Sequence, residues 1–217
     1  MAPTTTDTID FTLMYATHEA FRRDVGRLKT AALSATTGSP AVRAGWENFR
    51  RQLLIHHEVE DENLWPQVER KVADRPDALA LLTEMEAEHA LLDPLLESVD
   101  ARLESGDEEL RDEIHRLQEV LDHHLRHEED SALPLIQEVL TRAEWGTFAA
   151  GMRRKQGVRG AVVYIPWAVD GASSVRQDEF FAAMPGPTRA LNRLVLQRHY
   201  RRLALWGPAA GRDGGEQ

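Results

Sequence analysis

Residues 56–66 read HHEVEDENLWP, and residues 124–134 read HLRHEEDSALP. In each segment a histidine precedes a glutamate by four positions, and that glutamate precedes a proline by six. Residues four apart face the same side of an α-helix. The two segments therefore predict two helices that each present one His–Glu pair on one face: His56 with Glu60, and His124 with Glu128.

The two segments lie in the second and the fourth of four long helical patterns, which fill about the first 140 residues. Apolar residues recur at helical spacing in each pattern, and short Gly-, Pro- and Asp-containing segments separate the patterns. This organisation favours an all-α fold, with an up-down-up-down antiparallel four-helix bundle over residues 8–141. Pro66 and Pro134 lie at matching places, where each would remove one backbone hydrogen bond from its helix.

The sequence changes character after the bundle. Residues 142–206 predict a C-terminal extension of short helices and loop that packs on the bundle, with the β-branched and aromatic residues 158–167 extended or looped. The Gly-rich residues 207–217 predict a disordered tail. Residues 1–150 carry 15 Lys and Arg against 31 Asp and Glu, whereas residues 151–217 carry 11 against 5. We expect the extension either to cover one end of the bundle or to offer a basic surface to an anionic partner.

Composition excludes several classes of function. Cysteine is absent, which excludes disulfides, thiolate metal sites and cysteine nucleophiles. The acidic body argues against nucleic acid as a partner. The sequence has no apolar run long enough for a membrane span, and its first residues do not resemble a signal peptide. We therefore expect a cytoplasmic protein with no membrane partner, whether monomer or dimer.

Each of the four predicted helices places one histidine within its apolar stripe. These histidines are 38, 33 and 35 residues apart, about one helix and one loop each time, so an antiparallel bundle brings them to a similar height. Buried imidazoles without partners are costly, whereas a metal ion uses neutral imidazole as a ligand. Two carboxylates can span two ions, and an N/O donor set without thiolate suits iron or manganese better than structural zinc. The predicted ligands are His18, His56, Glu60, His89, His124 and Glu128.

A neighbouring register was weighed against this set. His57 and Asp61 are also four residues apart, but His57 shares a helical face with Arg50, and its equivalent in the second segment is Leu125. We therefore predict that substitution of His56 abolishes metal binding and that substitution of His57 does not. Whether further residues join the ligands is left open; the candidates are Tyr15, Glu86, Asp93 and Glu129, and Arg22 is a candidate for a supporting role.

These motifs resemble the hemerythrin HHE cation-binding family over about residues 8–140. The resemblance implies a four-helix bundle around two oxo- or hydroxo-bridged non-haem iron ions, with manganese or zinc as alternatives. His18 and His56 would hold one iron, His89 and His124 the other, and Glu60 and Glu128 would bridge them. YIPW at residues 164–167 and PGPTR at residues 185–189 resemble the C-terminal extensions of actinobacterial hemerythrin-like proteins.

The sequence departs from the oxygen-carrying members of that family in its third helix. They carry two histidines there, four residues apart, whereas Met85 and Asp93 flank His89 at that spacing. A missing histidine would leave one iron with an open position, which favours reaction with O2, peroxide or nitric oxide over reversible carriage. We expect a di-iron protein that reacts with or senses such small molecules. Three alternatives remain: catalase- or peroxidase-like turnover, a non-enzymatic oxygen or iron sensor or store that signals through the basic extension, and a metal-free bundle whose histidines are core residues.

Overall fold

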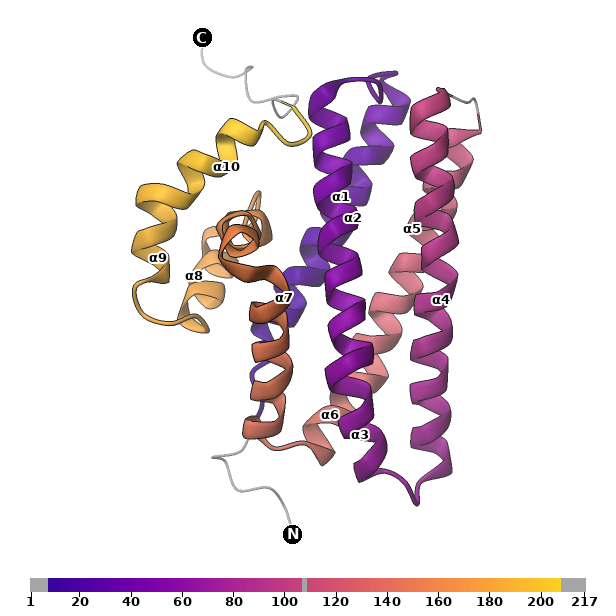
Figure 1. Ribbon diagram of the computed structural model, residues 1–217, viewed down its shortest axis with the longest axis vertical. Helices are drawn as coiled ribbons and strands as arrows, with labels where there is room; N and C mark the ends of the chain where they lie inside the picture. The colour runs from indigo at the N-terminus through magenta and orange to yellow at the C-terminus, as the bar shows by residue number, and fades with distance from the viewer. Residues whose placement is uncertain (1–7, 107–108, 208–217) are drawn as a thin grey trace.

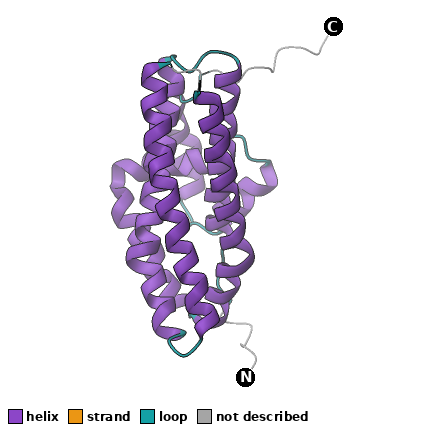
Figure 2. Ribbon diagram, turned by 90° about the vertical axis from the view of Figure 1, so that its right-hand side faces the viewer, coloured by secondary structure: helices purple, strands orange, loops and turns teal. Residues whose placement is uncertain are grey.

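The computed structural model describes residues 8–106 and 109–207, and every regular element in these ranges is helical (Figure 2). Four long helical runs lie side by side along the long axis of the molecule (Figure 1). They are α1 (Thr12–Leu33), α2 (Pro40–Val59) continued by α3 (Trp65–Lys71), α4 (Pro76–Ser105), and α5 (Leu110–His127) continued by α6 (Leu133–Val139). The all-helical bundle is as predicted, and its up-down-up-down order stays a prediction.

Local signals in the sequence set the ends of these helices. The side chain of Ser39 accepts a hydrogen bond from the backbone N–H of Val42 and caps α2, and Pro40 follows at the first helical position. Pro76 begins α4 in the same way. Gly106 ends α4 with a φ of 71°, a left-handed conformation that costs glycine little.

The two repeated segments share an unusual backbone feature. A π-helical turn, η1 (Glu60–Leu64), joins α2 to α3, and η2 (Glu128–Ala132) joins α5 to α6 in the same way. In each turn, a backbone N–H donates a hydrogen bond to the glutamate carbonyl five residues earlier. Trp65 donates to Glu60, and Leu133 donates to Glu128. These wide turns precede Pro66 and Pro134, and they let each helix continue past a residue that has no N–H to donate.

The core consists of two apolar clusters with a polar layer between them. Phe21, Phe49 and Leu96 belong to one cluster, and Trp65 and Met85 belong to the other. In each long run, the buried histidine lies between residues of the first cluster and residues of the second. Burial on both sides therefore holds a layer of titratable side chains deep inside the bundle.

The C-terminal extension packs along the flank of the bundle rather than over its end. It comprises α7 (Arg142–Ala168), α8 (Ser174–Ala182), α9 (Thr188–Leu191), the π turn η3 (Asn192–Leu196) and α10 (Gln197–Leu203). Helix α7 contacts both α1 and α2, and α8 contacts α1 (Figure 1). The expectation that residues 158–167 are extended or looped is wrong, since α7 includes them. It kinks at Gly157, where φ is 60°.

Buried polar contacts fix this extension to α1. Asp24 is fully buried, and its carboxylate accepts hydrogen bonds from Trp167 Nε1 at 2.7 Å and from Arg23 Nε at 2.8 Å. At the far end of the extension, the indole of Trp206 lies so close to Gly45 on α2 that a Cβ there would overlap it. The extension is thus held at the C-terminal end of α7 and again at its own C-terminal end, and packing against α1 overrides the local β propensity of residues 158–167.

Two further features bear on the sequence predictions. Within the described ranges, no helix combines the length and apolar character needed to cross a membrane. The predicted disordered tail lies, apart from Gly207, outside the described residues.

Candidate metal centre

The polar layer of the bundle contains five histidines and two glutamates. All seven are at most 6% exposed, although residues of these types are rarely buried without partners. They come from α1, α2, η1, α4, α5 and η2. The seven residues are His18, His56, His57, Glu60, His89, His124 and Glu128.

One group within the layer comprises His18, His56 and Glu128, each with a ligand atom within 4.8 Å of the others. The Nε2 atoms of His18 and His56 face each other at 3.2 Å. Glu128 Oε2 lies 3.2 Å from His18 Nε2. A nitrogen–nitrogen contact of this length needs a proton or a cation between the two lone pairs, so the group suits a shared ion.

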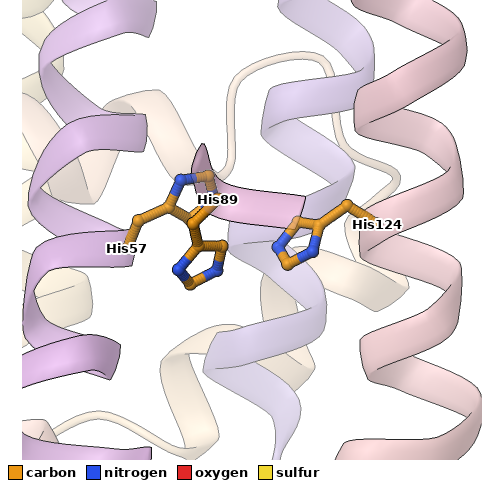
Figure 3. A group of neighbouring side chains, drawn as sticks. All are labelled: His57, His89 and His124. Atoms are coloured by element: carbon orange, nitrogen blue, oxygen red, sulfur yellow. The ribbon is translucent and has the colours of Figure 1, made fainter. Parts of the chain in front are cut away.

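A second group comprises His57, His89 and His124, which point toward one another from α2, α4 and α5 (Figure 3). The rings of His57 and His89 stack with their centroids 4.0 Å apart, and the ring of His124 lies edge-on to both. Three imidazoles from three helices converge here without a carboxylate among them. This arrangement offers three nitrogen ligands to one ion.

Glu60 connects the two groups. Its Oε1 lies 3.0 Å from His56 Nε2 in the first group, and its Oε2 lies 3.6 Å from His89 Nε2 in the second. A carboxylate with one oxygen toward each group is placed to bridge two ions. The six sequence-predicted ligands thus lie in one layer, and the structure adds His57 to them.

The hydrogen bonding of the layer fits cations rather than a closed polar network. Both carboxylate oxygens of Glu60 and both of Glu128 are buried and have no hydrogen-bond partner. The same holds for Nε2 of His57, of His89 and of His124. Each unsatisfied buried polar atom costs roughly 1–3 kcal/mol. Metal ions would satisfy all seven atoms at once, so the residues present fit the ligands of a metal centre.

Burial keeps most of the imidazoles neutral, as metal binding requires. It lowers the pKa of His56 and His57 well below the usual value, and neighbouring histidines add to the effect. Burial also lowers the pKa of His124. His18 differs: burial lowers its pKa, but the charge of Glu128, whose Oε2 lies 3.2 Å from His18 Nε2, and the hydrogen bond to Glu129 outweigh that effect, so the pKa is raised.

The two buried glutamates experience different surroundings. Burial, followed by the charge of Glu128, raises the pKa of Glu60 well above its ordinary value. Burial also acts to raise the pKa of Glu128, but the charge of the neighbouring His18 prevails and lowers this pKa to about 2. Two carboxylates in one dry layer repel each other, and cations between them would hold both in the ionised form.

Three carboxylates outside the layer orient its histidines through the opposite ring nitrogen. Glu129 Oε1 lies 2.8 Å from His18 Nδ1, Asp61 Oδ1 lies 2.9 Å from His89 Nδ1, and Glu88 Oε2 lies 2.9 Å from His124 Nδ1. Such contacts fix the tautomer, so that Nε2 carries the free lone pair. Glu129 is therefore placed as a support for His18 and not among the ligand atoms.

The other candidates from the sequence lie outside the layer. Glu86 and Asp93 are exposed on α4, and Tyr15 is 40% exposed. Arg22 forms two hydrogen bonds with Glu129, at 2.8 and 3.1 Å, and so acts on His18 only through that carboxylate. Tyr15, Arg22 and Glu129 line a surface pocket on this side of the bundle.

His57 is the residue of the layer that the sequence predictions set aside. His56 and His57 are about 100° apart around α2. The first therefore faces His18 on α1, while the second stacks on His89 of α4. Arg50, which shares the face of His57, lies farther along α2, where it pairs with Asp100. The signal that could have found His57 is the tandem HH itself, next to a third helix with a single histidine in the corresponding stripe.

Comparisons with known proteins agree with this geometry. No curated protein and no solved structure matches the chain. The family model of the hemerythrin HHE cation-binding domain matches residues 10–136, which include every residue of the layer. With more than half of its length matched and with the buried His/Glu groups in place, the chain belongs to the hemerythrin HHE cation-binding family.

Proposed function

We propose that the chain binds two iron ions in the polar layer, at the middle of an up-down-up-down bundle, and reacts with O2, peroxide or nitric oxide. His18 and His56 would hold one ion, and His57, His89 and His124 the other. Glu60 and Glu128 would bridge the two. The observation that carries the proposal is the set of seven buried ligand atoms of Glu60, Glu128, His57, His89 and His124 that have no hydrogen-bond partner.

The chemistry of the donors favours iron. Imidazole and carboxylate donors suit iron and manganese, and the chain has no thiolate to select zinc. Bound iron would supply one-electron and O2 chemistry. The protein contributes neutral imidazoles, a dry layer between two apolar clusters, and carboxylates that hold the histidine tautomers.

The two groups are unequal, which favours reaction at one of them. The group of His18 and His56 has one histidine fewer than the group of His57, His89 and His124. It also lies beside the pocket of Tyr15, Arg22 and Glu129, since Glu129 touches His18. We infer that small molecules reach the layer from this side and react at the ion with fewer protein ligands.

Metal analysis and an absorption spectrum in air test the proposal. We expect two iron ions per chain, near-ultraviolet absorption from a ferric pair, and loss of both in His56→Ala. His115→Ala is the matched control, since His115 is exposed on α5. A protein expressed with added iron that contains no iron, manganese or zinc would contradict the proposal.

Peroxide separates turnover from sensing. Steady O2 evolution supports catalase-like activity, whereas a single stoichiometric oxidation supports a sensor or store. In a sensor or store, the Lys and Arg residues that are in excess in residues 151–217 would contact an anionic partner. Truncation is a poor test of that role because α7 packs on α1 and α2; charge reversal of exposed arginines is the better one.

A further inference from the structure

A second type of His/Glu cluster lies outside the polar layer, on the surface between α4 and α5. His123 and His127 are one turn apart on α5, with ring centroids 5.9 Å apart. Glu88 faces them from α4. The side chain of His123 is 71% exposed, that of His127 is 23% exposed and that of Glu88 is 12% exposed. The cluster therefore combines one partly buried carboxylate with two histidines that water can reach.

The distances in this cluster match those between ligands of one ion. Glu88 Oε1 lies 2.8 Å from His127 Nδ1 and 3.4 Å from His123 Nε2, and one ligand atom of each residue lies within 4.8 Å of the others. Ligands that bind one ion at about 2.0–2.2 Å are themselves about 3–3.5 Å apart. Small adjustments of two surface side chains would bring all three atoms around one ion.

We propose that Glu88, His123 and His127 form a third site, for a single divalent cation such as zinc, distinct from the metal centre of the layer. Two imidazole nitrogens and one carboxylate oxygen would bind the ion, and its exposure would leave the remaining position to water. Glu84 supports this arrangement, since its Oε2 lies 3.7 Å from His127 Nε2 and would orient that ring.

Glu88 links this outer site to the polar layer. Its Oε1 faces His123 and His127, while its Oε2 accepts a hydrogen bond from His124 Nδ1. A cation on Oε1 would withdraw charge from the carboxylate that supports His124, and so would change the donor strength of that ligand. This part of the inference rests on the proposed function of the layer, whereas the outer site itself does not.

Zinc binding tests the outer site. Equilibrium dialysis of the full chain against zinc should give one more ion per chain for the wild type than for His123→Ala. His123 suits the test because its side chain is largely exposed, so its removal should leave the fold intact. His115→Ala is the matched control: His115 lies on the same helix and pairs with the exposed Glu119 at 3.4 Å, so its removal should leave the count unchanged.

The outcome separates the outer site from the layer. If the layer binds no metal, His123→Ala still lowers the zinc count by one, and the outer site stands. Equal zinc counts and affinities in the wild type and His123→Ala overturn it. For the link, addition of zinc to the iron-loaded protein should shift its absorption spectrum in the wild type and not in His123→Ala. Equal spectra in the two proteins after zinc addition overturn the link.

Discussion

The two repeated segments, residues 56–66 and 124–134, share one backbone design and differ in the number of histidines that they place in the polar layer. In both, an α-helix ends one residue before a buried glutamate, a π turn of five residues begins at that glutamate, and a new helix begins one residue before a proline. All these features are separated by the same 68 residues. The position after the first histidine differs: His57 in one segment corresponds to Leu125 in the other.

The supporting carboxylates follow the same repeat. Asp61 follows the buried Glu60 and binds His89 on α4, while Glu129 follows the buried Glu128 and binds His18 on α1. Each segment thus supplies one buried carboxylate to the polar layer and one support for a histidine on another helix. Because only the first segment adds a second histidine to the polar layer, the repeat builds two unequal His/Glu groups from nearly equal parts.

The largest expected effect comes from making the two segments alike at that position. His57→Leu copies Leu125, which is fully buried, so the substitution should preserve the fold. The group of His89 and His124 would lose one of three nitrogen ligands. We expect one of the two ions to bind at least about 100-fold more weakly, the upper end of what loss of a supporting residue costs. Iron titration followed by absorbance measures this change.

This experiment also decides between the two ligand sets. The sequence predicted that substitution of His57 would leave metal binding intact, and the buried stack of His57 on His89 revises that prediction. If His57→Leu binds two ions with unchanged affinity, His57 is a core residue and not a metal ligand. Thermal unfolding of the metal-free variant should match that of the wild type and serves as the control for folding.

A smaller effect is expected from the two supporting carboxylates, which should not be equivalent. Glu129→Gln and Asp61→Asn each remove the charge that supports one histidine, and such losses cost about 10–100-fold in metal affinity. The side chain of Glu129 is 18% exposed and that of Asp61 is 44% exposed, so water screens the second contact more. We therefore expect Glu129→Gln to weaken iron binding more than Asp61→Asn. Equal losses, measured side by side, would show that burial does not control these contacts.

Sequence reasoning succeeded where a contact depends on spacing along one helix. The pairs His56–Glu60 and His124–Glu128 need only the helical repeat, and both lie in the polar layer. The helical face that His57 shares with Arg50, and its alignment with Leu125, favoured His56 alone. A helix in a bundle faces two neighbours, however, and adjacent histidines on α2 reach α1 and α4 separately.

Other features depend on packing that no local pattern contains. The prolines predicted the loss of one backbone hydrogen bond from each helix. They did not predict the π turn that accommodates this loss before Trp65 and before Leu133. The β-branched residues of 158–167 favoured an extended chain, yet they are helical because Trp167 packs against α1 and bonds to the buried Asp24. Tertiary contacts of this kind outweigh local propensities that differ by about 1 kcal/mol.

The smallest expected effect comes from Arg22, which lies on α1 and binds Glu129 of the second segment. Burial acts to raise the pKa of Glu129, but hydrogen bonds from His18 and Arg22 prevail and lower it. A lowered carboxylate pKa means that the contact is present at higher pH and is lost as the pH falls through that pKa. Arg22→Gln removes one of the two hydrogen-bonding partners, so the pKa of Glu129 should rise and the contact with His18 should be lost at a higher pH.

Iron binding measured against pH tests this. At neutral pH, Arg22→Gln should weaken binding only a few-fold, because a partly exposed ion pair contributes about 0.2–1 kcal/mol. On acidification, the variant should release iron at a higher pH than the wild type. Arg43→Gln, remote from the layer on α2, is the control and should release iron at the wild-type pH. If Arg22→Gln and the wild type release iron at the same pH, then His18 alone sets the charge of Glu129, and the two segments are equivalent in this respect as well.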